Sequence, residues 1–266
     1  MHPVERLRHI ARATGAPGQL VATEAAWALA AFADDPQGLV TACRRMVSRQ
    51  PRSGALVWLC ARALTAGDPA TELRRAVADL DGDRTPKELE HALPVDATVA
   101  VVGWPEVIGE VLPRRGDIEV LVVDVRGEGS GLVRRLANAD VDAVDVPASG
   151  LAAAVAAADL VLLEAAVVAP TELLAAAGSH AAAAVGHTSG VPVWAVAGVG
   201  RLLPARMWEP LRARVVTAEP WDEDDEVVPL ALVDRIVATH GSEPVEDALR
   251  RTDCPVAPEL FKGDVL

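Results

Sequence analysis

The chain has 266 residues, of which 51% are hydrophobic, and a formal net charge of −13 at pH 7. This length and composition suit a globular protein with a large core and an acidic surface, in one large domain or two modest ones. The negative charge disfavours nonspecific binding to nucleic acid and to anionic membranes, so we expect neither as a partner.

The amino-terminal stretch and the cysteines indicate the cellular location and exclude two kinds of structural site. Residues 1–15 carry charges throughout and lack the apolar segment of a signal peptide, and no apolar run is long enough to span a membrane. We therefore expect a cytoplasmic protein. The three cysteines are far apart and form no CxxC pair, which indicates neither a zinc site nor a disulfide framework. We expect no metal and no cofactor.

Residues 1–90 are predicted to form a helical domain. Ala-, Leu- and Arg-rich runs are interrupted by Gly and Pro, for example at Asp35-Pro36, as is typical of short helices joined by turns. The segment 81–97 is polar, contains Gly82, Pro86 and Pro94, and is predicted to be the link to the next domain. The predicted helices begin near Pro3 and continue at 19–33, 37–49, 55–66 and 69–80.

Residues 91–266 are predicted to form a Rossmann-like α/β domain. Val-rich runs alternate with runs of helical length, and the apolar runs are nearly continuous, which is typical of strands buried on both faces. Such a repeat needs crossover connections and gives a parallel sheet with helices on both faces. The predicted strands are 98–102, 118–123, 141–146, 159–163, 192–197 and 213–217. The predicted helices are 105–113, 129–138, 149–157, 171–186, 204–211, 229–239 and 244–251.

The carboxyl ends of the strands are the expected place for a functional site. Gly127, Gly129 and Gly131 follow a strand and precede a helix, so their backbone N–H groups are candidates to hold a phosphate or a carboxylate. A flexible loop with a helix cap is the more ordinary interpretation. Arg126, at the end of the same strand, could pair with a phosphate or with an acidic neighbour.

Two further strand-end features have a functional and an ordinary interpretation. A carboxylate at Glu164 is partly desolvated and could act as a base, but a structural ion pair explains it at least as well. Gly178-Ser179-His180 lies inside a predicted helix without a nearby acidic partner, so we interpret it as a close approach of small residues rather than a catalytic triad. The acidic run 222–226 is predicted to be a solvated loop.

Segments along nearly the whole chain match, in order and spacing, the motifs of one superfamily. The matching segments are Thr14-Gly15-Ala16, Gln50-Pro51-Arg52 with 53–56, the strand 99–102 with Gly103-Trp104, Asp124-Val125-Arg126-Gly127 with Gly131, Ala158-Asp159-Leu160, Gly178-Ser179, and Val228-Pro229 with 233–241. By these segments the chain resembles the initiation factor 2B alpha/beta/delta superfamily. This superfamily also contains methylthioribose-1-phosphate isomerase and ribose-1,5-bisphosphate isomerase.

The resemblance implies a helical region followed by a Rossmann-like domain, and a homodimer formed through the latter. It also implies a site for a phosphorylated small molecule. The ligand-binding residues implied in this way are Arg52, Gly103, Arg126, Gly127, Gly129, Gly131, Gly178 and Ser179.

The chain departs from the isomerases at the positions that carry their chemistry. The resemblance implies a cysteine and an aspartate as proton-transfer groups, but these positions fall on Gly103 and on Ala165 or Ala166. Since neither glycine nor alanine can carry a proton, we predict that isomerase activity is absent and that the chain has no catalytic residue. The expected role is then to bind a phosphorylated metabolite or to act as a regulatory or interaction dimer. The alternative is a sugar-phosphate isomerase with relocated chemistry, in which Glu164 is the base. A translation exchange subunit is a third hypothesis, which only the family name supports.

Overall fold

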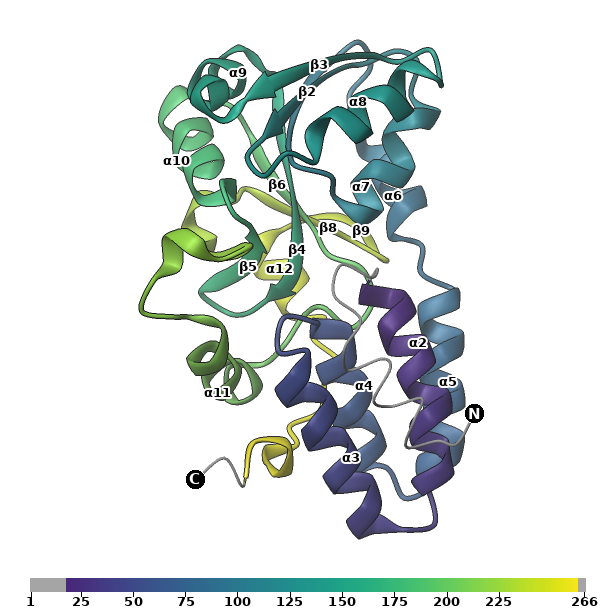
Figure 1. Ribbon diagram of the computed structural model, residues 1–266. Coiled ribbons are helices and arrows are strands. Elements are labelled where there is room, and N and C mark those ends of the chain that lie inside the picture. The colour runs from purple at the N-terminus through teal and green to yellow at the C-terminus, as the bar shows by residue number, and fades with distance from the viewer. Residues whose placement is uncertain (1–17, 263–266) are drawn as a thin grey trace.

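The computed structural model describes residues 18–262, so the helix expected near Pro3 lies outside the described residues. A layer of helices lies below a mixed sheet that has helices on both faces (Figure 1). The expected order, helices first and then alternating strands and helices, is confirmed. No helix in the described range combines the length and the apolar character that crossing a membrane requires.

Four helices form the layer at the amino-terminal side: α2 (Gly18–Leu29), α3 (Pro36–Arg49), α4 (Gly54–Thr65) and α5 (Pro69–Asp81). Helix α4 lies at the centre, with nine of its 12 residues buried, and the other three pack around it. The carboxylates of Asp35 and Asp68 and the hydroxyl of Ser53 each accept a hydrogen bond from the backbone N–H three residues later. These caps satisfy donors that a helix start leaves unpaired, and they explain where three of the helices begin.

The segment predicted as a polar link contains a further helix, α6 (Thr85–Ala92). Pro86 lies in its first turn, where a missing N–H has no consequence because those donors have no partner inside the helix. The Asp83 carboxylate accepts from the backbone N–H of Thr85 at 2.8 Å, and Leu89 is buried against the sheet. The proline thus marks the start of a helix and not a break.

Six parallel strands form the centre of the sheet: β1 (Thr98–Val102), β2 (Glu119–Asp124), β3 (Asp142–Pro147), β4 (Leu160–Val168), β6 (Val193–Val196) and β8 (Arg235–Ala238). They lie in the order β3-β2-β1-β4-β6-β8, and each neighbouring pair is parallel. The parallel sheet was predicted, but β8 was not among its predicted strands. The strand order reverses between β1 and β4, where the connections of the two strands leave in opposite directions. A crevice is expected at the carboxyl ends of these two strands.

Helices cover both faces of this sheet, as predicted: α7 (Glu106–Val111), α8 (Gly129–Ala137), α9 (Leu151–Ala157) and α10 (Ser179–Ser189). Helices α6, α7 and α8 lie on one face, and α9 and α10 lie on the other (Figure 1). Successive residues of β1 alternate between the two faces of the sheet. Val99 and Val101 belong to the core under α6, α7 and α8, and Ala100 and Val102 belong to the core under α9 and α10. Burial on both faces explains the unbroken apolar runs.

Three antiparallel strands extend the sheet: β5 (Glu172–Ala176), β7 (Asp225–Pro229) and β9 (Gly241–Pro244). The predicted helix 171–186 is wrong in its first part, because β5 pairs there with β4 on one edge and with β7 on the other. Two ladders of backbone hydrogen bonds outweigh the helix propensity of its alanines. Gly178, at φ +95°, separates this strand from α10.

The carboxyl-terminal part differs from the prediction in three further places. The predicted strand 213–217 is largely the end of α11 (Ala205–Val215), and the acidic run 222–226 leads into β7. The segment 229–239 was predicted as a helix, which is wrong for its second half, because that half forms β8. Ile236 and Val237 of this strand pack on opposite faces of the sheet. This alternation is the period of a strand. The segment 244–251 contains only the short helix α12 (Val245–Leu249).

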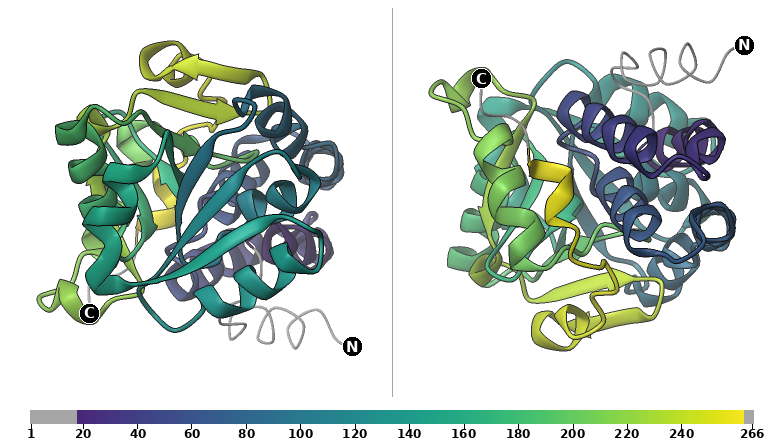
Figure 2. Two further views of the ribbon diagram at one scale, coloured as in Figure 1. Left: turned by 90° about the horizontal axis from the view of Figure 1, so that it is seen from above. Right: turned by 90° about the horizontal axis from the view of Figure 1, so that it is seen from below.

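The end of the described chain returns to the helical layer. The backbone carbonyl of Glu259 accepts a hydrogen bond from Arg44 Nε of α3 at 2.6 Å. Seen from below, this terminal turn lies beside α11 (Figure 2). Single 3-10 turns span Ala30–Phe32, Leu112–Arg114, Ala148–Gly150, Pro220–Asp222, Leu230–Leu232 and Pro258–Phe261.

Candidate functional site

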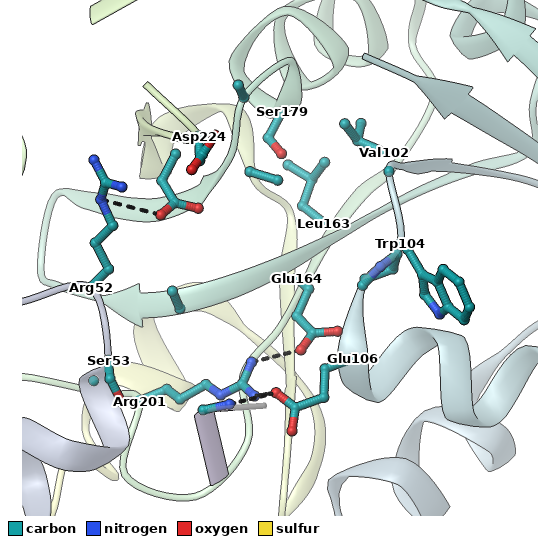
Figure 3. A pocket seen from close by; sticks show the side chains of 18 of the residues that line it. Arg52, Ser53, Val102, Trp104, Glu106, Leu163, Glu164, Ser179, Arg201 and Asp224 are labelled. Carbon is teal, nitrogen blue, oxygen red and sulfur yellow. Dashed lines mark hydrogen bonds and ion pairs between the residues drawn. The ribbon is translucent and has the colours of Figure 1, made fainter. Parts of the chain in front are cut away.

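A cavity of about 700 Å³ lies at the carboxyl ends of β1 and β4, between the sheet and the start of α4 (Figure 3). It occupies the crevice expected from the strand order. Helix α4 approaches β4 so closely that a Cβ on Gly54 would lie 2.5 Å from the carbonyl oxygen of Ala166. The helical layer therefore forms one wall of the cavity, and glycine is the residue that permits this contact.

The floor of the cavity is an ion-paired cluster of Glu164, Arg201 and Glu106 (Figure 3). Arg201 Nη1 donates to Glu164 Oε1 at 2.8 Å and to the Ala165 carbonyl at 3.1 Å, and Nη2 donates to Glu106 Oε2 at 3.2 Å. The second oxygen of Glu164 accepts from the backbone N–H groups of Val107 at 2.8 Å and Ile108 at 3.2 Å. Glu164 therefore caps α7 and pairs with a buried cation.

Burial governs the electrostatics of this floor. The Arg201 side chain is 9% exposed, and although burial opposes its charge, the carboxylates of Glu164 and Glu106 hold its pKa above the ordinary arginine value. Burial raises the pKa of Glu106, which Arg201 only partly offsets. With two carboxylates around one guanidinium, the floor carries a formal charge of −1.

The opposite rim joins Arg52 and Arg126 to the acidic segment, which we define as residues 223–225. Arg52 forms ion pairs with Glu223 and, over 3.4 Å, with Asp225. Arg126 forms an ion pair with Asp224 and donates to the backbone carbonyl of Glu223 at 3.2 Å. Burial raises the pKa of Asp225, and the hydrogen bond from Arg52 lowers that of Glu223. Both arginines predicted to hold a phosphate are thus paired with carboxylates of the chain.

The glycine loop is also occupied by a carboxylate of the chain. Asp124 Oδ1 accepts from the backbone N–H groups of Gly127 at 2.5 Å and Glu128 at 3.0 Å. A Cβ on Gly129 would lie 2.7 Å from Asp124 Cβ, and one on Gly131 would lie 2.4 Å from the ring of Trp104. These glycines make room for Asp124 and Trp104, and the cavity lining does not include the three loop glycines.

The Gly178-Ser179 segment starts α10 at the edge of the cavity. A Cβ on Gly178 would lie 2.7 Å from Val125 Cγ2, and the backbone N–H of His180 donates to Glu226 Oε1 at 2.8 Å. Ser179 is 2% exposed and lines the cavity. Among residues 18–262 its hydroxyl has no hydrogen-bond partner, and it points into the cavity (Figure 3).

The structure brings together five of the nine residues singled out from the sequence: Arg52, Gly103, Arg126, Glu164 and Ser179 line the cavity. Gly103 is at φ +64°, with open space where a Cβ would project. Arg201, Glu106 and Asp225 also line the cavity, and the sequence did not predict them as site residues. The position of Arg201 shortly after β6 was the available signal, since that too is a strand end. Within the described residues, no cluster of three metal-ligating side chains occurs.

The cavity lining is acidic overall. It contains three arginines and five carboxylates, a formal charge of −2. The charged lining residues are Arg52, Arg126, Arg201, Glu106, Glu128, Glu164, Asp224 and Asp225. The groups suited to hold an anion, namely the arginines, the glycine loop and the start of α10, each already contact a carboxylate of the chain.

No protein-family model and no curated protein sequence matches the chain. Solved structures do match. The translation initiation factor eIF-2B of Pyrococcus horikoshii OT3 superposes with a TM-score of 0.75 at 12% identity, over 93% of this chain and 98% of that one. A chain of the tetrameric eIF2B-beta2-delta2 complex from C. thermophilum gives 0.75 at 16%, over 93% and 91%. Subunit delta of eIF-2B from A. fulgidus gives 0.57 at 13%, over 98% and 92%. The resemblance is therefore confirmed at the level of the fold.

Proposed function

We propose that this chain is a non-catalytic protein with the eIF2B-type fold that binds a small molecule in its strand-end cavity. The observation that carries the proposal is the state of Glu164, which is held by Arg201 and by two backbone N–H groups. Both oxygens of this carboxylate already accept hydrogen bonds from the chain, so the side chain is held in place by α7 and Arg201. The cavity keeps the shape of a ligand site without a free general base at β4.

Two of the other carboxylates of the lining also have partners. Glu106 accepts from Arg201 and from the backbone N–H of Gly18 at 3.1 Å, and Asp225 pairs with Arg52. The alternative isomerase with Glu164 as base requires this carboxylate to lie beside Arg126. Its cationic partner is Arg201 instead, while Arg126 pairs with Asp224. No contact favours the alternative.

The phosphorylated ligand and the homodimer stay predictions. A phosphate would have to displace carboxylates from Arg52 and Arg126, which makes it a poor candidate. The homodimer is supported by the likeness to a chain of the tetrameric eIF2B-beta2-delta2 complex. Sedimentation analysis of the purified protein tests it, and a monomer at micromolar concentration would contradict it.

The absence of catalysis is tested directly with the two substrates that the family resemblance names. The protein is incubated with ribose-1,5-bisphosphate and with methylthioribose-1-phosphate, and ³¹P NMR follows the sugar phosphate. We expect no conversion above the uncatalysed rate. Turnover that disappears in Glu164→Gln would overturn the proposal in favour of the relocated isomerase.

The binding part is tested by thermal unfolding with a panel of small metabolites, with and without phosphate. A ligand of the folded state at a hundredfold excess over its Kd adds about 2.7 kcal/mol to the free energy of unfolding. The control is Gly103→Asn, which places a side chain in the open cavity and uses the residue that best tolerates a positive φ after glycine. We expect ligand shifts in the parent protein and none in this variant. If no compound shifts the parent protein, the binding proposal fails.

A further inference from the structure

The chemistry of the cavity indicates which class of molecule it takes. Its lining has a formal charge of −2, and each anion-binding group is already neutralised by a carboxylate of the chain. An incoming anion would add to this excess charge and would have to break existing ion pairs. An incoming cation would reduce the excess negative charge of the lining and would not have to break an ion pair.

Two partly buried carboxylates at opposite sides of the cavity are incompletely compensated, with 24% of the Asp225 side chain and 33% of the Glu106 side chain exposed. Asp225 is one of three acidic side chains that share two arginines, and its contact with Arg52 is long, at 3.4 Å. Glu106 shares Arg201 with Glu164, and its own contact is the longer of the two, at 3.2 Å against 2.8 Å. The raised pKa values of both groups, which burial causes, agree with this incomplete compensation.

One further group suits a ligand with polar substituents. Ser179 is a buried residue whose hydroxyl points into the cavity and has no partner in the described chain, which leaves it open to a polar group of a ligand. Trp104 lies at the cavity wall across from Arg52, but its indole ring is turned away from the cavity, where Gly109 and Gly131 leave the space for it (Figure 3).

We propose that the cavity binds a small organic cation, an amine or guanidine with polar substituents, through Asp225 or Glu106 and through Ser179. This inference rests on the proposed function, because it takes the cavity to be a ligand site. It differs from the phosphorylated metabolite that the sequence resemblance implies. The protonated nitrogen donates to one of the two carboxylates, and the Ser179 hydroxyl accepts from or donates to a polar substituent of the ligand.

The experiment separates amine from phosphate on one molecular frame. Thermal unfolding and titration calorimetry are carried out on the full chain with glucose, glucosamine, glucose 6-phosphate and glucosamine 6-phosphate, and with agmatine as a guanidine without a sugar. We expect stabilisation by glucosamine or agmatine, none by glucose 6-phosphate, and weaker binding at higher salt concentration. Stabilisation by both phosphates irrespective of the amine would overturn the cation inference and leave the binding proposal intact. If none of the five probes stabilises the protein, the cation inference is overturned. If no compound of the wider metabolite panel stabilises it either, the binding proposal is overturned as well.

Two variants with a matched control assign the effect to the named residues. Asp225→Asn should weaken binding of the cationic probe at least about tenfold, as expected for a hydrogen bond to a charged group, and Ser179→Ala about two- to tenfold. Because the Ser179 hydroxyl has no partner in the described chain, Ser179→Ala should leave the unliganded stability unchanged. The control is Asp222→Asn, which removes the same charge from a neighbouring position outside the lining and should not change the affinity. Equal affinities in all three variants would contradict the proposal.

Discussion

At the scale of single residues, Arg201 is the one charged residue among the buried residues of the described chain. It is buried, and its partners Glu164 and Glu106 are the two carboxylates at the cavity floor. Removing one member of such a cluster leaves the others charged in a poorly solvated place. Breaking a buried ion pair in this way is far more costly than losing a surface pair.

We therefore expect Arg201→Met to lower the free energy of unfolding by about 3–5 kcal/mol. Urea denaturation at pH 7 measures the change. The control is Arg84→Met, which removes an exposed arginine that pairs with Glu88 four residues later, and it should change stability by less than about 1 kcal/mol. Equal effects of the two substitutions would show that the cluster at the cavity floor is solvated.

Glu106 gives a pH dependence whose sign follows from its raised pKa. Because burial holds the folded-state pKa above the unfolded value, the folded chain binds more protons than the unfolded chain between the two values. The contribution of Glu106 to stability therefore falls as the pH rises through this window, and it is constant on either side.

Urea denaturation of the parent protein and of Glu106→Gln between pH 4 and pH 7 isolates this contribution, because the variant lacks the titrating group. The stability of the parent relative to the variant should decrease with rising pH above the ordinary carboxyl range. A relative stability that increases with pH would mean that Arg201 dominates over burial.

At the scale of elements, the junction between β5 and α10 depends on one glycine. Gly178 is at φ +95°, and a Cβ there would lie 2.7 Å from Val125 Cγ2. The turn ends the strand and places Ser179 at the cavity.

We expect Gly178→Ala to lower the free energy of unfolding by about 1–2 kcal/mol, from the left-handed backbone alone, and to perturb the Ser179 position. Chemical denaturation measures the first effect, and the affinity for a cavity ligand measures the second. Gly116→Ala is the matched control, because Gly116 has open space around it and no positive φ. A neutral Gly178→Ala variant would refute the assigned role of the turn.

At the scale of the whole molecule, the helical layer and the sheet share one apolar core. The cluster around α4 includes Trp58 together with Val167 of β4, Leu174 of β5, Trp208 of α11 and Leu260 near the end of the described chain. The division into a helical domain over 1–90 and an α/β domain over 91–266 stays a prediction. The shared core argues that neither part keeps its stability alone.

We therefore expect a single unfolding transition for the whole chain. Hydrogen exchange under native conditions should give the most protected amides of α4 and of β4 the same opening free energy, because both exchange only through global unfolding. A markedly lower value for α4 would show that residues 1–90 form a separate cooperative unit.

The sequence by itself determined the helices and parallel strands whose signals are local. Side-chain caps such as Asp35 and Ser53 mark helix starts, and unbroken apolar runs mark strands buried on both faces. The place of the cavity followed as well, because parallel strands end at one edge of the sheet. The local signals failed for β5 and β8, since backbone pairing with distant strands outweighs the weak preferences of short alanine- and valine-rich segments.

Only the tertiary structure decided what the strand-end residues do. Arg52 lies 171 residues from Glu223, and Arg201 lies 37 residues from Glu164, so no local pattern reveals either pair. The sequence predicts charges at the edge of the sheet but not their partners, because ion pairing depends on distance in space. In this fold the arginines and the glycine loop face carboxylates of the same chain. A site that resembles an anion-binding site in sequence is therefore acidic in three dimensions.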